Sequence, residues 1–213
     1  FLKYGTPLIL GQLVWGTNLF ANSMILGHLG ESVTTAVSIA NTLNNLMYVA
    51  VNGLAGAVGI VTGKKVGAGD IDDIREYSKT VQIGFLCLGV VTSAFFLLTG
   101  NAFIGLYDIT PESAEYARQF IHVLCVTAIG TCYQCPCLFG LVKSGGDVSF
   151  VFKNDTIAVF CVVIPSALIT SLAGCPPWIV FLCLKSDQIF KCFVAFVKIQ
   201  KYNWMKNLTR QEA

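Results

Sequence analysis

Five long stretches of this chain carry no charged side chain, and they constrain the fold more than any other feature. They are residues 4–26, 32–63, 80–102, 123–142 and 156–184. A helix needs roughly 20 apolar residues to cross the hydrocarbon core of a bilayer. Because lipid offers no partners to backbone amides, such stretches must be helical inside a membrane. The chain is therefore expected to be an all-α membrane protein.

The composition agrees with this class. Of the 213 residues, 54% are apolar and 12% are charged, whereas about 25% of the residues are charged in an ordinary soluble domain. The net charge of +2 does not call for a nucleic-acid partner, because basic loops beside a membrane account for it.

The stretches predict a bundle of six membrane-spanning helices within residues 1–198, followed by a cytoplasmic tail at 199–213. The spans are expected near 5–26, 34–62, 80–99, 119–140, 155–173 and 177–198. Thr110 is expected to cap a helix that begins at Pro111. Because the chain opens on Phe1 and not on Met, a further portion is expected upstream.

The basic residues predict the orientation of the bundle. Arg118 alone falls on one side of the expected spans, while Lys185 and Lys191 fall inside the last one. The other eleven fall on the opposite side: Lys3, Lys64, Lys65, Arg75, Lys79, Lys143, Lys153, Lys198, Lys201, Lys206 and Arg210. Cytoplasmic loops carry the excess of Lys and Arg, so both termini are expected in the cytoplasm.

The second expected span carries a polar stripe. Its members follow one another at intervals of four, three, four, three and four residues: Thr34, Ser38, Asn41, Asn45, Tyr48 and Asn52. At about 100° per residue they share one narrow sector of a helix. Either they hydrogen-bond to neighbouring helices, or they line a substrate cavity. The length of the stripe favours the cavity.

The first expected span carries a shorter series of Gly11, Trp15, Asn18 and Asn22, with Gln12 just beside its line. Trp15 is suited to stacking on flat or cationic compounds, an attraction of about 0.5–2 kcal/mol. Packing and interfacial anchoring are the alternatives for this side chain.

Ionisable residues inside the last spans are the candidates for ion coupling. Asp187 and Lys191 are four residues apart with the acid first, the favourable order for a helical pair. They form a self-neutralised pair, or the lysines reach towards the cytoplasmic membrane surface, or the residues supply a protonatable or gating group. Asp155 is the third candidate, and an N-cap at the membrane interface is its alternative role.

The segment CYQCPCLFG (132–140) places Cys132, Cys135 and Cys137 around Pro136. Thiolates bind soft metals such as Cu(I) or Zn(II), but buried cysteines also behave as small apolar residues, and a membrane helix tolerates a proline kink. The sequence favours a kinked, thiol-lined helix end without a metal. No enzymatic motif is found, because His28 and His122 lie far apart and no phosphate-binding GxxxxGK[ST] occurs.

Six ordered segments resemble the carboxyl half of bacterial MATE (multidrug and toxic compound extrusion) transporters. They are ILGHLG (25–30), NGLAGAVGIVTGKKVGAGD (52–70), KSGGDVSFVFKND (143–155), VVIP (162–165), LKSDQIFKCFVAF (184–196) and WMKNLTR (204–210). The resemblance implies one lobe of a twelve-helix transporter in the bacterial cytoplasmic (inner) membrane. The other lobe is then either a missing amino-terminal half or a second copy of this chain.

The resemblance implies a cation-coupled antiporter that exports amphipathic or cationic compounds by alternating access. The coupling ion is H⁺ or Na⁺, and no cofactor is expected. A flippase of lipid-linked glycans from the same superfamily is one alternative, and it calls for inward-facing Arg or Lys. A non-transporting membrane scaffold is the other. Many members carry an acid in the first helix of this half. Here Gln12 and Trp15 occupy that region, which leaves Asp155, Asp187 and Lys191 as the coupling candidates.

Overall fold

The computed structural model of the chain describes residues 2–69 and 71–205, and the elements in these residues are all helical. They are α1 (Leu2–Gly27), α2 (Glu31–Ala68), α3 (Ile71–Ile104), α4 (Pro111–Cys135), η1 (Pro136–Val142), α5 (Val148–Ile157), η2 (Ala158–Val163), α6 (Ile164–Leu172), α7 (Pro177–Leu184) and α8 (Ser186–Gln200). The segments η1 and η2 are π-helical. The predicted all-α class is confirmed.

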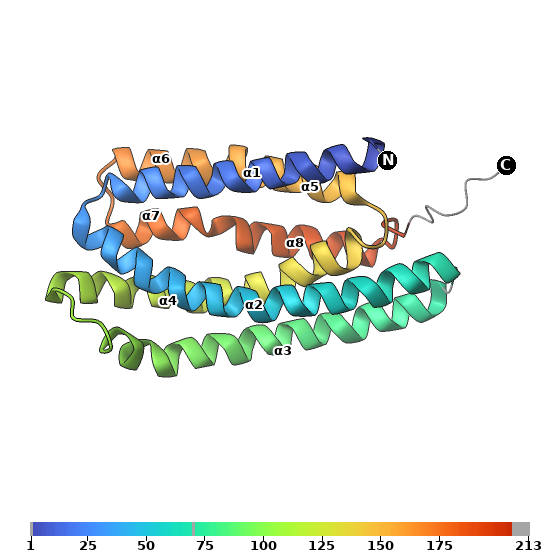
Figure 1. Cartoon of the computed structure of the whole chain (residues 1–213), viewed down its shortest axis with the longest axis horizontal. Helices are drawn as coiled ribbons and strands as arrows, with labels where there is room; N and C mark the ends of the chain where they lie inside the picture. The colour runs from blue at the N-terminus through green and yellow to red at the C-terminus, as the bar shows by residue number, and fades with distance from the viewer. Residues whose placement is uncertain (1, 70, 206–213) are drawn as a thin grey trace.

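These elements form six rods (Figure 1). The helices α1, α2 and α3 are single rods, α4 continues directly into η1, and α5, η2 and α6 follow one another without a break. The sixth rod is α7 with α8, interrupted at Lys185, where ψ is 1°. The ranges expected from the sequence fall on these rods in order, but the last range was expected to be one continuous helix. The prediction of one continuous helix over residues 177–198 is therefore wrong.

Within the described residues, four helices are long and apolar enough to cross a membrane. They comprise residues 31–68, 72–104, 111–142 and 148–172. The α7–α8 rod consists of pieces of 8 and 15 residues, and each piece alone is shorter than the roughly 20 residues that a crossing needs.

The rods pack side by side with α4 at the centre. Helix α4 contacts α2, α3, α7 and α8, while α1 packs mainly on α5. In Figure 1, α7 and α8 lie between the layer of α1, α5 and α6 and the layer of α2 and α4, and α3 forms the outer edge. The start of α4 is capped as expected, because Oγ1 of Thr110 accepts a hydrogen bond from the backbone N–H of Ser113 at 3.3 Å.

One end of the bundle, here called the basic end, gathers most of the charge. The start of α1, the end of α8 and the α2–α3 and α4–α5 connections all lie there (Figure 1). The lysines at or near this end include Lys64, Lys65, Lys143 and Lys198, and all four fall on one side in the arrangement expected from the sequence. The arrangement in space therefore brings the basic loops together.

Glycine at position 130 allows α4 and α8 to approach closely. A Cβ atom at Gly130 would lie 2.9 Å from the backbone oxygen of Gln188 on α8 and 3.2 Å from its carbonyl carbon. Real Cβ atoms do not approach backbone that closely, so a larger residue must push the two helices apart. The same two helices hold the polar site described below.

We expect Gly130→Ala to lower the free energy of unfolding by about 1–3 kcal/mol, because overpacking between rigid backbones forces them to shift. Gly84→Ala in α3 is the matched control, since a Cβ there meets nothing within 4 Å. Denaturation in detergent micelles, followed by tryptophan fluorescence, measures both variants. Equal effects of the two substitutions would contradict the close approach at Gly130.

Candidate functional site

Three charged side chains meet inside the bundle, near the break between α7 and α8. The ammonium of Lys191 lies 2.9 Å from Oδ1 of Asp155 and 3.1 Å from Oδ2 of Asp187. The side chains of Asp155, Lys191 and Asp187 are 17%, 11% and 5% exposed. The predicted helical pair of Asp187 and Lys191 is confirmed, and Asp155 joins it from another helix. We call these residues the ion triad.

Two alternatives from the sequence are corrected at the ion triad. Asp155 lies inside α5, and Asp147 holds the N-cap position of that helix instead. Lys191 does not extend towards the membrane surface, because its ammonium is held between two buried carboxylates. A buried charge is costly unless it is paired and hydrogen-bonded, which explains why the three groups are found together.

A network of neutral polar side chains fixes one end of the ion triad. The Gln188 amide donates to both carboxylate oxygens of Asp187, at 3.0 and 3.1 Å. Its carbonyl oxygen accepts hydrogen bonds from the Thr131 hydroxyl at 3.1 Å and from the Gln134 amide at 2.9 Å. One turn of α4 and the first turn of α8 are thus tied to the orientation of one carboxylate.

Two buried polar atoms beside the ion triad have no hydrogen-bond partner. They are the carbonyl oxygen of Gln134 and the amide nitrogen of Asn154, and both side chains are less than one-tenth exposed. Buried polar atoms are normally satisfied. The Gln134 oxygen can therefore accept, and the Asn154 amide can donate, a further hydrogen bond, for example with water.

The helices are irregular on both sides of the ion triad. The segment η1 begins directly after Cys135, and η2 begins three residues after Asp155. Asp187 lies in the first turn of α8, just beyond the break at Lys185. π-Helical turns are often found at functional sites, and a carboxylate is stabilised near the start of a helix. The backbone thus departs from a regular helix around the charged groups.

The predicted cavity residues on α2 lie on an open side of the bundle. Ser38, Asn45 and Asn52 are exposed, and Asn41 and Tyr48 are half-buried. Ser38 donates to the carbonyl oxygen of Thr34 on its own helix. The hydrogen bonds that connect these residues to other helices include one from the Cys135 thiol to Oδ1 of Asn52, at 3.9 Å. Hydrogen bonding between helices therefore does not account for the stripe.

The predicted residues on α1 divide into two pairs. Gln12 and Trp15 are exposed, with 61% of Trp15 accessible. Asn18 and Asn22 are half-buried, and the carbonyl oxygen of each lacks a hydrogen-bond partner. The first pair is free to meet a ligand or another protein surface, and the second faces its neighbours with unsatisfied polar atoms.

The three cysteines of the CYQCPC segment are buried but contact different partners. The Cys132 thiol lies 3.9 Å from the Thr92 hydroxyl, and the Cys135 thiol faces Asn52. Within residues 2–69 and 71–205, no three His, Cys, Asp or Glu side chains are arranged to hold a metal ion. Pro136 starts the π-helical segment η1, where the sequence predicted a kink.

A second buried ion pair closes the basic end. The Lys198 ammonium on α8 lies 2.7 Å from Oδ2 of Asp147 and 4.2 Å from the centre of the Phe150 ring. Sequence reasoning missed this pair and also missed Thr131, Gln134 and Gln188. The signal was present in α8, whose charged and polar residues Asp187, Lys191 and Lys198 recur with the spacing of a helix core face.

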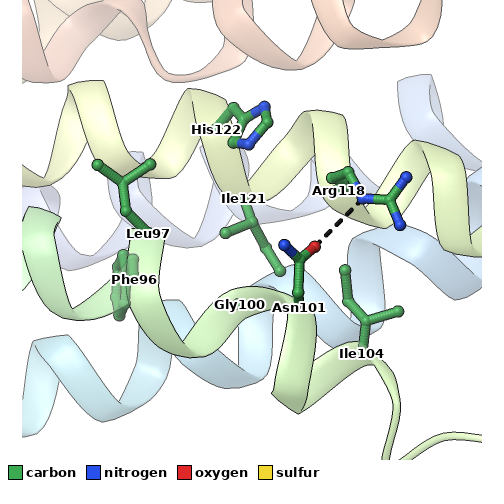
Figure 2. Close-up of a pocket in the computed structure, with 8 residues that line it drawn as sticks. All are labelled: Phe96, Leu97, Gly100, Asn101, Ile104, Arg118, Ile121 and His122. Carbon is green, nitrogen blue, oxygen red and sulfur yellow. Dashed lines mark hydrogen bonds between the residues drawn. The ribbon is translucent and has the colours of Figure 1, made fainter.

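A small pocket at the opposite end of the bundle does not have the properties of a ligand site. Figure 2 shows it between α3 and α4, where Nε of Arg118 donates to Oδ1 of Asn101 at 3.2 Å. Its volume is about 10 Å³, room for about one water molecule. His122 also lines this pocket. It lies in the first half of α4, whereas Thr131 and Gln134 of the network beside the ion triad lie in the second half.

Comparison with known proteins gives two results. The model of the MatE family matches residues 7–169 of the chain. A solved structure of a MOP superfamily transporter from Pyrococcus furiosus, described as having a binding pocket of reverse polarity, shares the fold with a TM-score of 0.86. It is 16% identical over 98% of this chain, and the chain covers 46% of that structure. The chain therefore spans about half the length of the protein it matches.

Proposed function

Since this chain belongs to the MatE family of membrane transporters, we propose that it is one half of a cation-coupled antiporter. In this proposal the complete protein exports amphipathic or cationic compounds in exchange for an incoming proton or sodium ion. Two lobes rock around a shared cavity and open it to each side of the membrane in turn. The second lobe is an amino-terminal half or a second copy of the chain.

The ion triad is the observation that carries this proposal. Placing an ionisable group inside a membrane costs free energy, and such groups mark ion pathways and proton relays. Asp155 and Asp187 come from different helices and share one ammonium at 2.9 and 3.1 Å. A change in the charge of either carboxylate therefore changes the force between α5 and α8. That is the link a coupled transporter needs between ion binding and helix movement.

The exposed polar face of α2 supports a cavity shared with another lobe. Ser38, Asn45 and Asn52 are exposed on a chain that covers about half of the matched structure. Amides facing lipid are unfavourable, so a polar face needs water, ligand or protein against it. We infer that this face, with Gln12 and Trp15 of α1, lines the cavity.

The basic end is proposed to face the cytoplasm of a bacterial cell, because cytoplasmic loops carry the excess of lysine and arginine. The flippase alternative is less well supported. A diphosphate headgroup calls for Arg or Lys on the cavity face, and the described parts of α1 and α2 carry lysines only at Lys3, Lys64 and Lys65, near the basic end. A scaffold without transport has no need of the ion triad.

The double variant Asn45→Leu/Asn52→Leu tests the cavity. We expect export of a cationic dye such as ethidium by the complete native protein to fall at least about tenfold, since two of the polar groups facing the ligand are lost. Dye efflux from cells and the amount of protein in the membrane fraction are measured together. Thr80→Leu is the control, because Thr80 is likewise exposed but lies on α3, outside the proposed cavity face. Unchanged efflux in the double variant would exclude this face as the cavity wall.

A further inference from the structure

The position of the Lys191 ammonium indicates which cation binds at the ion triad. This inference rests on the antiporter proposed above. The nitrogen lies between the two carboxylates, 2.9 Å from one and 3.1 Å from the other. A metal cation shared by Asp155 and Asp187 would have to occupy this same place. We propose that Lys191 is a resident cation that excludes sodium from the ion triad, so that the site couples to protons.

Sodium fits this arrangement poorly. Hard metal cations are held by several oxygen ligands at once. Of the four carboxylate oxygens, Oδ1 of Asp155 and Oδ2 of Asp187 face the ammonium, and both oxygens of Asp187 also accept the Gln188 amide. A sodium ion would therefore have to displace Lys191 or lie directly beside its positive charge. Repulsion between like charges is strong where water is scarce.

A proton avoids both difficulties, because it binds a single oxygen and needs no coordination shell. Uptake of one proton from water forms an O–H bond on Asp155 and changes the charge of the ion triad from −1 to zero. Asp155 is the entry point, since its side chain is 17% exposed, compared with 5% for Asp187. Lys191 then keeps Asp187 as its only charged partner, and the ion pair that joins α5 to α8 is lost. Return of the proton restores the original contact.

The other titratable groups around the ion triad do not compete for this role. They are Tyr48 from α2, Cys132 and Cys135 from α4, Cys137 from η1, Cys161 from η2, Lys185 at the break and Cys192 on α8. Lys185 is the nearest further cation. Its ammonium lies 5.6 Å from the centre of the Phe181 ring, and within the described residues it makes no ion pair. Neither α1 beyond Thr6 nor η2 carries Asp, Glu, Lys, Arg or His.

Two binding measurements on the complete native protein, purified in detergent, test the inference without any substrate. Binding of ²²Na⁺ is measured by scintillation proximity, and carboxyl protonation is measured by infrared difference spectroscopy on acidification. The variants are Asp155→Asn, which keeps the pair of Lys191 and Asp187, and Lys191→Gln, which removes the ammonium. Lys191→Arg is the charge-conserving control.

We expect the wild-type protein and Asp155→Asn to bind the same amount of ²²Na⁺, while the protonated-carboxyl band of Asp155→Asn lacks the one component that Asp155 contributes in the wild type. Lys191→Gln is expected to bind Na⁺ at least about tenfold more tightly than the wild type, because two carboxylates then face an open position. Lys191→Arg is expected to behave as the wild type does. More ²²Na⁺ on the wild type than on Asp155→Asn would overturn the inference, and so would an identical carboxyl band in the two proteins.

The comparison of the wild type with Asp155→Asn tests the inference even if Lys191→Gln does not fold. Exchange of labelled ethidium across vesicles without any ion gradient separates this inference from the proposed function. Exchange together with sodium binding at the ion triad would leave the antiporter intact and reject only the proton. Absence of exchange in the wild type would reject transport of this dye, whatever ion the site binds.

Discussion

Replacing Asp155 by asparagine is expected to lower uphill export by the complete native protein at least about tenfold, while exchange of substrate down its gradient continues. The amide cannot change its charge, so Lys191 stays paired with Asp187 in every state. The ion gradient then no longer changes the interaction between α5 and α8. Both rates are measured with ethidium in reconstituted vesicles, one with an imposed ion gradient and one without.

Asp73→Asn is the control for the loss of a carboxylate. Asp73 also pairs with a lysine, at 3.0 Å from Lys65, but its side chain is 69% exposed at the basic end. An exposed pair contributes about 0–1 kcal/mol, so this variant is expected to export normally. Equal uphill export by the Asp155 and Asp73 variants would remove the ion triad from the coupling mechanism.

Replacing Lys191 by methionine is expected to cost about 3–5 kcal/mol of folding free energy, because removal of one partner leaves buried charge without compensation. Two carboxylates on α5 and α8 then face each other in the interior. Unfolding in mixed detergent micelles, followed by tryptophan fluorescence, measures the loss. Lys64→Met is the control for the same change at an exposed lysine, where substitutions stay within about 0.5 kcal/mol.

A neutral triad distinguishes loss of pairing from loss of packing. The triple variant Asp155→Asn/Asp187→Asn/Lys191→Met contains no unpaired charge, and buried ion pairs replaced as a whole are often neutral in stability. We expect it to recover most of the stability lost in Lys191→Met. A triple variant as unstable as Lys191→Met would instead assign the effect to the lysine side-chain packing.

The course of the chain was predictable from sequence because charge is so sparse in it. Uncharged stretches located the first five rods. The Thr110 cap and the contact of Asp187 with Lys191 followed from local rules, since each involves residues within one turn. The family resemblance also held, because the ordered segments extend over most of the length.

The rest of the site depends on contacts between distant segments. The 36-residue separation of Asp155 and Lys191 carries no local signal, so the N-cap assignment of Asp155 was an equally good prediction until the ion pair between α5 and α8 was known. The break at Lys185 was hidden for a different reason. Neither glycine nor proline marks it, and Pro176 and Pro177 lie a full helix earlier.

The broken α7–α8 rod also has a consequence for biosynthesis. Its pieces of 8 and 15 residues carry Lys185, Asp187 and Lys191, and the translocon disfavours a charged residue at the centre of a segment by about 2.5–3.5 kcal/mol. Asp155 belongs to the rod made just before it and supplies a counter-charge. We therefore expect insertion of the last segment to depend on its pairing with Asp155, which couples membrane insertion to tertiary folding at this end of the protein.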